Sequence, residues 1–527
     1  MKQMQGLDTV FVAMERPTAP VHIGSVLIYD PSTAPGGFVR FKDILSFIEN
    51  RLHMSDTMRQ KMVKVPFGID YPYWVQDSTF DIEYHIRHVA LPKPGDWRQL
   101  CILAARIFAR PLDLSRPPWE FTVVEGLDNI PGVPKGAYAI LTKVHHAAID
   151  GVSGVDLMNV LHTMTPDVDA PLPPDNWRPE ADPSQIGMFA RGYVSNLLNP
   201  FRQAKAMRNA VPGMVKTAKG LLKKEFDFNA LLNTPKTRFN GTVSPHRMFD
   251  SQSFALKDIK SLRALSDGAK LNDVMLSITG GAMRLYLDRY DELTEHSLTT
   301  MAPISVRDET EKNTMGNQVS AMFVPLGSHI PSARERMKYV TEETVKAKGL
   351  TNAMGARQMT EMAKLAPAPM MNIGAQLFSR LKLADLMKPT VNTVVTNVPG
   401  PPVPIYSTGA KLVGLHGMLC LVDGVKLGHV VHSYVDEVTL AFTACRSAIP
   451  DPDFYSDCIQ ASFDEHIEAL KTHMETQDAI AAKVAAKEKA SPKKKIARTS
   501  IKTDKTLTKT TKKSAVKPKP NGTAKKQ

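Results

Sequence analysis

Cysteine is scarce in this chain, which has only Cys101, Cys420, Cys445 and Cys458 among its 527 residues and no C-x-x-C pair. So few cysteines in so long a chain argue against a disulfide framework and fit a reducing compartment. Long apolar runs are missing too. The longest candidate, Leu412 to Val422, is shorter than the roughly 18 residues that a spanning helix needs. The sequence therefore predicts a protein that does not cross a membrane.

The N-terminus also lacks the apolar core of a signal peptide, because Met1 to Gly6 is mostly polar. Together with the few cysteines, this predicts a cytoplasmic protein that is not secreted. Peripheral attachment to a membrane surface remains compatible with the pattern.

Several catalytic motifs are absent as well. The sequence has no G-x-S-x-G elbow, no P-loop and no dinucleotide-binding glycine fingerprint. The helical pair of histidines four residues apart, typical of zinc proteases, is missing too. These absences make a serine hydrolase, a P-loop nucleotide hydrolase, a dinucleotide-dependent oxidoreductase and a zinc protease poor interpretations.

Positive charge is concentrated near the C-terminus. From Lys483 onward there are 16 Lys/Arg against Glu488 and Asp504, a net +14 in a chain whose total is +13. The preceding residues are therefore close to neutral, and the basic balance describes the tail. A second basic stretch, residues 186–225, mixes eight Lys/Arg and one acid with apolar side chains. It is either an amphipathic segment for anionic lipid surfaces or a crossover helix with a solvated face.

The order of apolar patterns predicts four segments. Residues 1–165 alternate strand-like and helix-like stretches, among them a β-favouring run from Ala137 to His145. Residues 166–240 are a linker with crossover helices, and residues 241–480 form a second α/β block. Within this block, Asn272 to Leu287 has a helical apolar pattern, and Phe463 to Met474 is expected to be a closing helix. Residues 481–527 contain too few large apolar residues to fold, so we expect them to be disordered.

The strongest chemical feature is the run His145-His146-Ala147-Ala148-Ile149-Asp150-Gly151. Neighbouring side chains on a strand point to opposite faces, so His145 and His146 cannot easily share a metal ion. One histidine at a strand end, entering a tight turn, could remove a hydroxyl proton near neutral pH. On the residues alone, this interpretation competes with that of a hydrogen-bonded histidine in the core.

This run resembles the H-H-x-x-x-D-G signature of CoA-dependent acyltransferases. Further segments resemble the bacterial wax ester synthase/diacylglycerol acyltransferase family and occur in that family's order. They are Leu7-Asp8 with Phe11, Glu15 and Pro20-x-His22-x-Gly24, Phe80-Asp81 with His85, Pro111-Leu112-Asp113, Arg116-Pro117-Pro118-Trp119-Glu120, Asn272-Asp273, Pro303-x-Ser305-Val306-Arg307, and Asn397-Val398-Pro399-Gly400-Pro401.

The resemblance implies an α/β fold of two chloramphenicol-acetyltransferase-like domains with a tunnel between them. It also implies transfer of a fatty acyl group from acyl-CoA to a long-chain alcohol, giving a wax ester, or to diacylglycerol, giving triacylglycerol. Acyl-CoA is then a substrate, and neither a cofactor nor a metal is required. Such an enzyme would be cytoplasmic and attached peripherally to the inner membrane or to lipid droplets.

The resemblance also assigns roles to site residues. His146 matches the family's general base, which acts in a ternary complex of enzyme and both substrates. Asp150 would pair with Arg307 to hold the loop, Gly151 would allow the chain to turn, and His145 would orient the loop.

Asn272 and Asp273 match a supporting motif of the family. An alternative is that they only cap the helix that follows. The sequence leaves this choice open.

Two other functions compete with this interpretation. One is an acyltransferase of the same superfamily with a different acceptor, because condensation domains share the histidine motif. The other is a non-enzymatic protein that binds lipid surfaces or, through its basic tail, nucleic acid.

Overall fold

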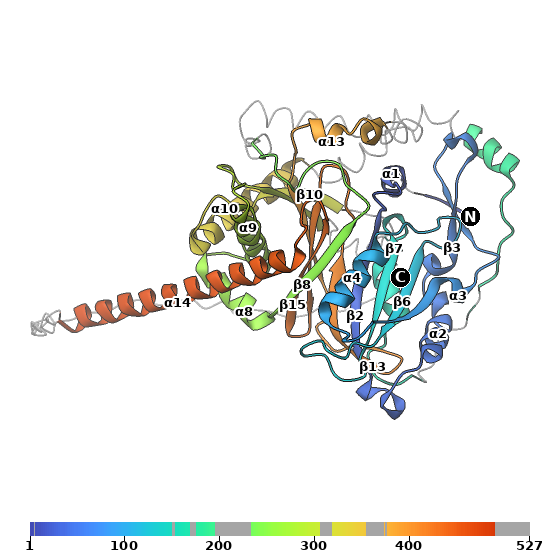
Figure 1. The fold of residues 1–527 in the computed structure, drawn as a ribbon. Coiled ribbons are helices and arrows are strands. Elements are labelled where there is room, and N and C mark those ends of the chain that lie inside the picture. Colours follow the sequence, from blue (N-terminus) through green and yellow to red (C-terminus); the bar gives the residue numbers. More distant parts are fainter. Residues whose placement is uncertain are drawn as a thin grey trace, which may run out of the picture. The chain divides into compact units, whose positions relative to one another are not determined.

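The structure is a computed structural model that describes residues 1–4, 6–149, 153–168, 175, 177–194, 233–305, 319–354, 374 and 377–490. The chain divides into two compact units, Met1–His473 and Met474–Gln527. The first unit combines helices with two large sheets, which confirms the predicted α/β class (Figure 1).

The first large sheet has six strands in the order β12-β13-β2-β7-β6-β5. Its strands are β2 (His22–Asp30), β5 (Ile86–Ala90), β6 (Trp119–Glu125), β7 (Tyr138–His145), β12 (Tyr406–Ser407) and β13 (Ala410–Met418). All neighbours pair antiparallel except β5 and β6, which are parallel. Strand β7 lies between β2 and β6, and all of its residues are buried. It corresponds to the apolar run predicted as a strand from residue 137.

Short helices and a small sheet accompany the first large sheet. The helices are α1 (Gly6–Met14), α2 (Phe41–Glu49), α3 (Ile82–His85), α4 (Trp97–Phe108) and α5 (Ser153–Leu161). The small sheet has the order β1-β4-β3 and consists of β1 (Lys2–Gln3), β3 (Gln60–Val63) and β4 (Tyr73–Gln76). Helix α4 begins where Asp96 accepts a hydrogen bond from the backbone N–H of Gln99, at 2.8 Å.

The second large sheet also has six strands, in the order β10-β9-β11-β14-β15-β8. They are β8 (Arg247–Ala255), β9 (Thr299–Ser305), β10 (Val319–Pro325), β11 (Thr393–Pro399), β14 (Leu427–Tyr434) and β15 (Glu437–Cys445). Strand β11 runs parallel to both of its neighbours, and the other pairs are antiparallel.

Two strands do not follow the predicted division of the chain. We assigned residues 241–480 to a C-terminal domain, but β12 and β13 belong to the first sheet. Strand β13 pairs antiparallel with β2, and its Leu412 and Leu415 are buried in the core of the first sheet. The boundary was placed by position in the sequence, whereas this pairing joins residues about four hundred positions apart.

Helix α4 and strand β8 join the two halves of the first unit. The Trp97 Nε1–H donates to Asp250 Oδ1 at 2.7 Å, and a buried apolar cluster holds α4 residues together with Phe249 and Ala441. Burial raises the pKa of Asp250 to about 6, against the lowering effect of the Trp97 hydrogen bond.

The second sheet is accompanied by α8 (Leu256–Ser261), α9 (Leu271–Arg289), α10 (Ala333–Met354), α13 (Leu383–Leu386) and α14 (Pro452–Ala490). Helix α9 matches the helical pattern predicted at residues 272–287. A Cβ at Gly280 would lie 2.2 Å from the Leu326 carbonyl oxygen, and one at Gly281 would lie 2.2 Å from Ser462 Oγ. The glycines therefore allow α9 to approach its neighbours closely.

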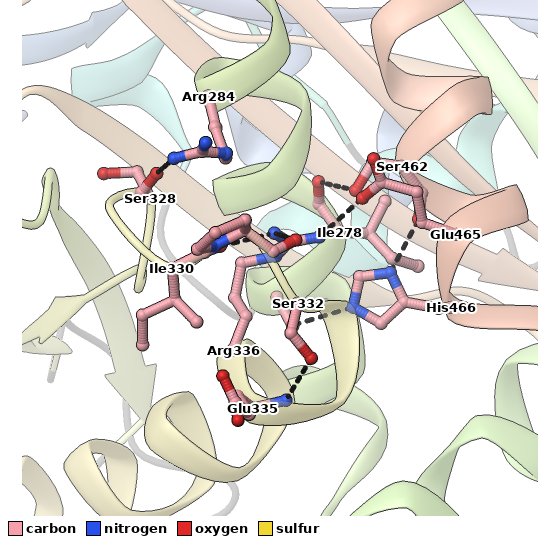
Figure 2. Close-up of polar contacts among 12 residues, drawn as sticks. Ile278, Arg284, Ser328, Ile330, Ser332, Glu335, Arg336, Ser462, Glu465 and His466 are labelled. Atoms are coloured by element: carbon pink, nitrogen blue, oxygen red, sulfur yellow. Dashed lines mark hydrogen bonds and ion pairs between the residues drawn. The ribbon is translucent and has the colours of Figure 1, made fainter. Parts of the chain in front are cut away.

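A polar network fills the contact between α9, α10 and α14 (Figure 2). The buried Arg336 donates to Glu465 Oε2 and to the Ile330 carbonyl oxygen, at 2.9 Å in both cases. His466 contacts Ser277 Oγ through Nε2 at 2.8 Å and the Ser462 carbonyl oxygen through Nδ1 at 2.6 Å. Each of these hydrogen bonds offsets the desolvation of a buried polar group.

Helix α14 is longer than predicted at both ends. The sequence predicted a closing helix from Phe463 to Met474 and disorder from residue 481, but α14 runs from Pro452 to Ala490. The residues from Ile480 to Ala490 are mostly Ala, Lys and Glu, which have high helix propensity. A lack of apolar residues therefore did not prevent a helix here, and residues 491–527 lie outside the described residues. None of the described helices is both long and apolar enough to cross a bilayer.

Four buried histidines predict how stability depends on pH. Burial lowers their pKa to about 4 for His162 and His416 and to about 3 for His429 and His466. The unfolded chain binds more protons than the folded chain between these values and about 6.5. We expect the free energy of unfolding to fall as the pH drops from about 6.5 to about 4, by up to about 1.4 kcal/mol per pH unit for each histidine.

Denaturant unfolding between about pH 7 and pH 5 would measure this slope. The raised pKa of Asp250 acts in the opposite direction and offsets part of it. In the variant His429→Gln, the free energy of unfolding should change less per pH unit than in the parent chain. The difference should correspond to about one bound proton. Equal stability across this pH range would contradict the expectation.

Candidate active site

The C-terminal end of strand β7 positions the two motif histidines. His145 is its last residue, and His146 begins a short 3-10 helix, His146–Ala148. The predicted place of the motif, at a strand end that enters a tight turn, is therefore confirmed. Each histidine is then fixed to a different neighbouring strand. The His145 N–H donates to the Pro118 carbonyl oxygen, just before β6, at 2.9 Å, and the His146 N–H donates to the Val21 carbonyl oxygen, just before β2, at 3.0 Å.

The side chain of His145 is used within the loop. Its Nδ1 accepts a hydrogen bond from the Ala147 N–H at 3.1 Å. The proton of a neutral His145 ring must then be on Nε2, which lies 3.5 Å from Glu15 Oε2. Nδ1 is thus used by the loop, whereas Nε2 lies near Glu15 without a hydrogen bond among the described residues. His145 is in a position to orient the loop, as its proposed role requires.

The side chain of His146 is placed differently. Its ring stacks on Phe11 of α1, with ring centroids 4.0 Å apart and an interplanar angle of 22°. Its Nδ1 is buried and has no hydrogen-bond partner among the described residues. Stacking on Phe11 is therefore the contact that holds the His146 ring in the described part of the chain.

The protonation of His146 follows from its surroundings. Burial is the main cause that lowers its pKa to about 4, and the neighbouring His145 lowers it further. The ring is then neutral near pH 7, so it can accept a proton. This is the state that a general base needs before the reaction begins.

Two residues of this site, Phe11 and Glu15, belong to the segment that resembles the family's opening, but the resemblance assigned them no role. Phe11 and Glu15 stand four residues apart, so that the end of α1 and the residue after it reach both histidines. Glu15 Oε1 also accepts from the Val21 N–H at 3.4 Å, which ties the carboxylate to the same edge of the sheet. Spacing along α1 could have indicated a shared face, but not which residues it would contact.

The interior around the motif holds further ionisable groups. Lys143, two residues before His145 on β7, is buried with Nζ 3.4 Å from Glu120 Oε1. His22 lies opposite His145 in the β2–β7 register and contacts the Phe108 carbonyl oxygen through Nε2 at 2.5 Å. Burial, followed by the charge of Lys143, lowers the pKa of His22 well below its ordinary value. These groups have protein partners, so they fit a structural role.

The Asn272-Asp273 pair lies at the start of α9. Asp273 is the third residue of the helix, and its Oδ2 accepts from the Lys270 N–H at 2.8 Å. This is a capping contact made from inside the helix, and burial raises the pKa of the Asp273 carboxyl group. No hydrogen bond or ion pair joins Asn272 or Asp273 to His146 within the described part of the chain.

The other predicted site residues, Asp150, Gly151 and Arg307, lie outside the described residues. The Asp150–Arg307 pair therefore stays a prediction.

Comparison with protein families gives two matches in chain order. Residues 4–275 match the wax ester synthase/diacylglycerol acyltransferase catalytic domain, and residues 315–466 match the C-terminal domain of the same family. A relative from Mycobacterium tuberculosis, named a probable diacylglycerol O-acyltransferase, is 30% identical over 488 residues, which cover 90% of this chain and 98% of the relative. A second relative from that species, whose name gives the same activity, is 28% identical over 480 residues, or 91% of each chain.

Solved structures show a similar fold. The wax ester synthase/diacylglycerol acyltransferase from Marinobacter aquaeolei VT8 superposes with a TM-score of 0.62 at 23% identity, over 89% of this chain and all of that one. The first condensation domain of the calcium-dependent antibiotic synthetase gives a TM-score of 0.51 at 14% identity, over 89% of this chain and 96% of that one. The expected acyltransferase fold is thereby confirmed.

The catalytic-domain match alone spans more than half of the 527 residues and includes the histidine motif. The chain therefore belongs to the wax ester synthase/diacylglycerol acyltransferase family and is an acyltransferase.

Proposed function

We propose that this protein transfers a fatty acyl group from acyl-CoA to the hydroxyl of a long-chain alcohol or of diacylglycerol, with His146 as general base. The observation that carries the proposal is the neutral imidazole of His146, placed directly after β7 and stacked on Phe11. The acceptors are those in the names of the family and of the relatives.

The chemistry needs one proton carrier and no covalent enzyme intermediate. His146 Nε2 takes the proton from the acceptor hydroxyl while the oxygen attacks the thioester carbonyl carbon. The C–S bond then breaks, and the same imidazole returns the proton to the departing CoA sulfur. An ester and free CoA result, so atoms and charge balance without a cofactor or a metal.

The surrounding residues would support this step in distinct ways. His145 and Glu15 hold the loop, so that the His146 ring has a fixed place. We further propose that Asp150 pairs with Arg307 and that Gly151 allows the turn. Asn272 and Asp273 would support the second domain from the start of α9. A tunnel between the two domains would admit CoA and acceptor from opposite mouths.

A different acceptor is the main alternative within this chemistry. The condensation domain that shares the fold belongs to the calcium-dependent antibiotic synthetase. Competition between hexadecanol, diacylglycerol and a small amine for the same acyl-CoA would identify the acceptor. Predominant acylation of the amine would contradict the proposed acceptor class and leave the acyltransferase class intact.

Replacing the proposed base tests the mechanism directly. His146→Ala should reduce kcat by about 10²–10⁴-fold, because general-base catalysis contributes a factor of that size. Circular dichroism and thermal unfolding should stay close to those of the parent, since the ring is held mainly by stacking. His88→Ala, at an exposed position on β5, is the matched control and should keep parental turnover. Near-parental turnover by His146→Ala would rule out this mechanism.

The pH dependence of the rate provides a second test. A base with a pKa of about 4 is ready at neutral pH, so kcat/KM should fall only as the pH approaches about 4. Phe11→Ala opens the ring to water and weakens the burial that lowers its pKa. The acid limb of the profile should then move upward, toward the ordinary value near 6.5. If the acid limb of the profile does not move in Phe11→Ala, then Phe11 does not lower the pKa of His146.

Attachment to an anionic surface is the role we propose for the tail. Residues 491–527 contain 13 Lys/Arg against one acid, Asp504. Each lysine near an anionic bilayer contributes roughly 1 kcal/mol, which salt reduces. A chain ending at Ala490 should keep its turnover on dispersed substrates and sediment less with phosphatidylglycerol vesicles at low salt.

The control for this experiment is a full-length chain whose tail lysines are changed to glutamine. It should behave like the shortened chain if charge is the cause. Equal sedimentation of all three chains would remove the attachment role. Preferential binding of the parent to DNA over vesicles would favour nucleic acid as the tail's partner.

A further inference from the structure

An apolar surface is exposed beside the small sheet. It is formed by residues that precede and residues that follow the histidine motif in the sequence. We call it the aromatic ledge. The Phe67 ring is 90% exposed and Ile186 is 84% exposed, although both are large apolar residues. The ledge consists of the exposed side chains of Phe67, Ile186, Phe189, Tyr193 and Val194.

The second part of the ledge is a helix, residues 185–194, seen as a short blue-green helix in Figure 1. Its sequence, Gln-Ile-Gly-Met-Phe-Ala-Arg-Gly-Tyr-Val, has only two polar side chains. Met188 and Gly192 form its buried side, and Ile186, Phe189 and Tyr193 form an exposed one. A helix that is apolar on both sides belongs inside a protein core or against lipid.

One side of this helix packs against the small sheet and the turn that follows β3. Met188 is buried with Val65, Tyr73 and Val75. A Cβ at Gly192 would lie only 3.0 Å from Val65, so the helix sits close to the chain beneath it. The exposed side chains are thus carried by a helix that packs against Val65 and the small sheet.

The segment that leads into this helix is tied to the small sheet. Trp177 Nε1–H donates to Gln76 Oε1 at 2.9 Å, and Lys61 lies 3.0 Å from an oxygen of Asp182. Arg59 contacts Asp175 at 2.8 Å. These contacts fix the start of the helix relative to β3 and β4.

Phe67 has an unusual backbone for its position. It has φ 59° and ψ 8°, the left-handed region that a residue with a side chain enters at an energetic disadvantage. In this conformation its ring lies at the edge of Phe189, with centroids 6.2 Å apart. Packing among the described residues does not explain an exposed aromatic ring in a disfavoured backbone conformation.

Positive charge follows the ledge in the sequence. Residues 195–224 contain seven Lys/Arg and no acid, and Lys64 and Arg191 are exposed on the two elements of the ledge itself. Basic residues beside aromatic and aliphatic ones are the composition that binds the interface of anionic membranes.

We infer that the aromatic ledge inserts into the headgroup region of an anionic lipid surface and is the apolar anchor of this protein. The choice of lipid as occupant rests on the proposed function, because both the acceptors and the products of that reaction are lipids. Aromatic rings suit this region, where an apolar body meets water and charged headgroups. The lysines and arginines contribute the electrostatic part of the attachment, and the ledge contributes the part that salt does not screen.

Polar substitutions that the backbone tolerates provide the test. Asparagine accepts the left-handed region, so Phe67→Asn removes the ring without straining the turn. It is combined with Phe189→Gln and Tyr193→Gln. Leu386→Gln, at a residue that is 79% exposed on α13, is the matched control. Sedimentation with phosphatidylcholine/phosphatidylglycerol vesicles is measured at low and at high salt, together with turnover on detergent-dispersed substrates, thermal unfolding and oligomeric state.

We expect the triple variant to bind vesicles about tenfold or more weakly than the parent, with the larger part of the loss persisting at high salt. Its turnover and unfolding temperature should match those of the parent, and Leu386→Gln should bind as the parent does. A parent that transfers no acyl group but still binds vesicles through the ledge would overturn the proposed function and leave this inference standing.

Three results would overturn the inference. The first is parental vesicle binding by the triple variant, or no vesicle binding by the parent. The second is an unfolding temperature several degrees lower in the single variant Phe67→Asn, which would show that the ring is covered within the chain. The third is a parent dimer that the triple variant does not form, which would make the ledge an interface between two copies.

Discussion

The two motif histidines extend the backbone hydrogen bonds of β7 by one residue past the start of each flanking strand. His145 bonds to the residue before β6 and His146 to the residue before β2, so the chain leaves the sheet held from both sides. A loop fixed in this way can present a side chain with little freedom to move away. The stacking of Phe11 and the contact of Glu15 depend on this placement, because α1 can meet the histidines only where the sheet puts them.

Neutral histidines are a recurring feature of this interior. His429 lies between Thr393 Oγ1 and the Tyr455 hydroxyl, at 2.9 Å and 2.8 Å, and His162 contacts the Tyr29 hydroxyl at 2.8 Å. Each of these rings has partners on the protein, which makes it structural. His146 shares the lowered pKa, but its buried Nδ1 has no hydrogen-bond partner among the described residues. His432 combines the same two features, so the place of His146 in the histidine motif directly after β7 is what distinguishes the proposed base.

The sequence was informative where the signal was local. The apolar run before His145 predicted β7, and the periodicity after residue 271 predicted α9. It failed where contacts join distant residues: β13 lies beside β2, and no local pattern specifies that pairing. The sequence alone does not indicate that the ring of Phe11 stacks on His146, because this contact depends on the fold. Helix α14 exceeds its predicted limits because residues with high helix propensity extend it even where few apolar side chains are available to pack.

If the proposed function holds, release of the product connects the active site with the aromatic ledge. Each methylene group moved from a lipid into water is unfavourable by about 0.8 kcal/mol, so an ester with two long chains has almost no tendency to leave through water. Release into a lipid surface avoids this barrier, provided that the surface is held against the enzyme. Charge alone would hold it only at low salt, whereas an inserted apolar anchor works at any ionic strength. On the proposed function, the exposed apolar side chains of the ledge would provide this anchor.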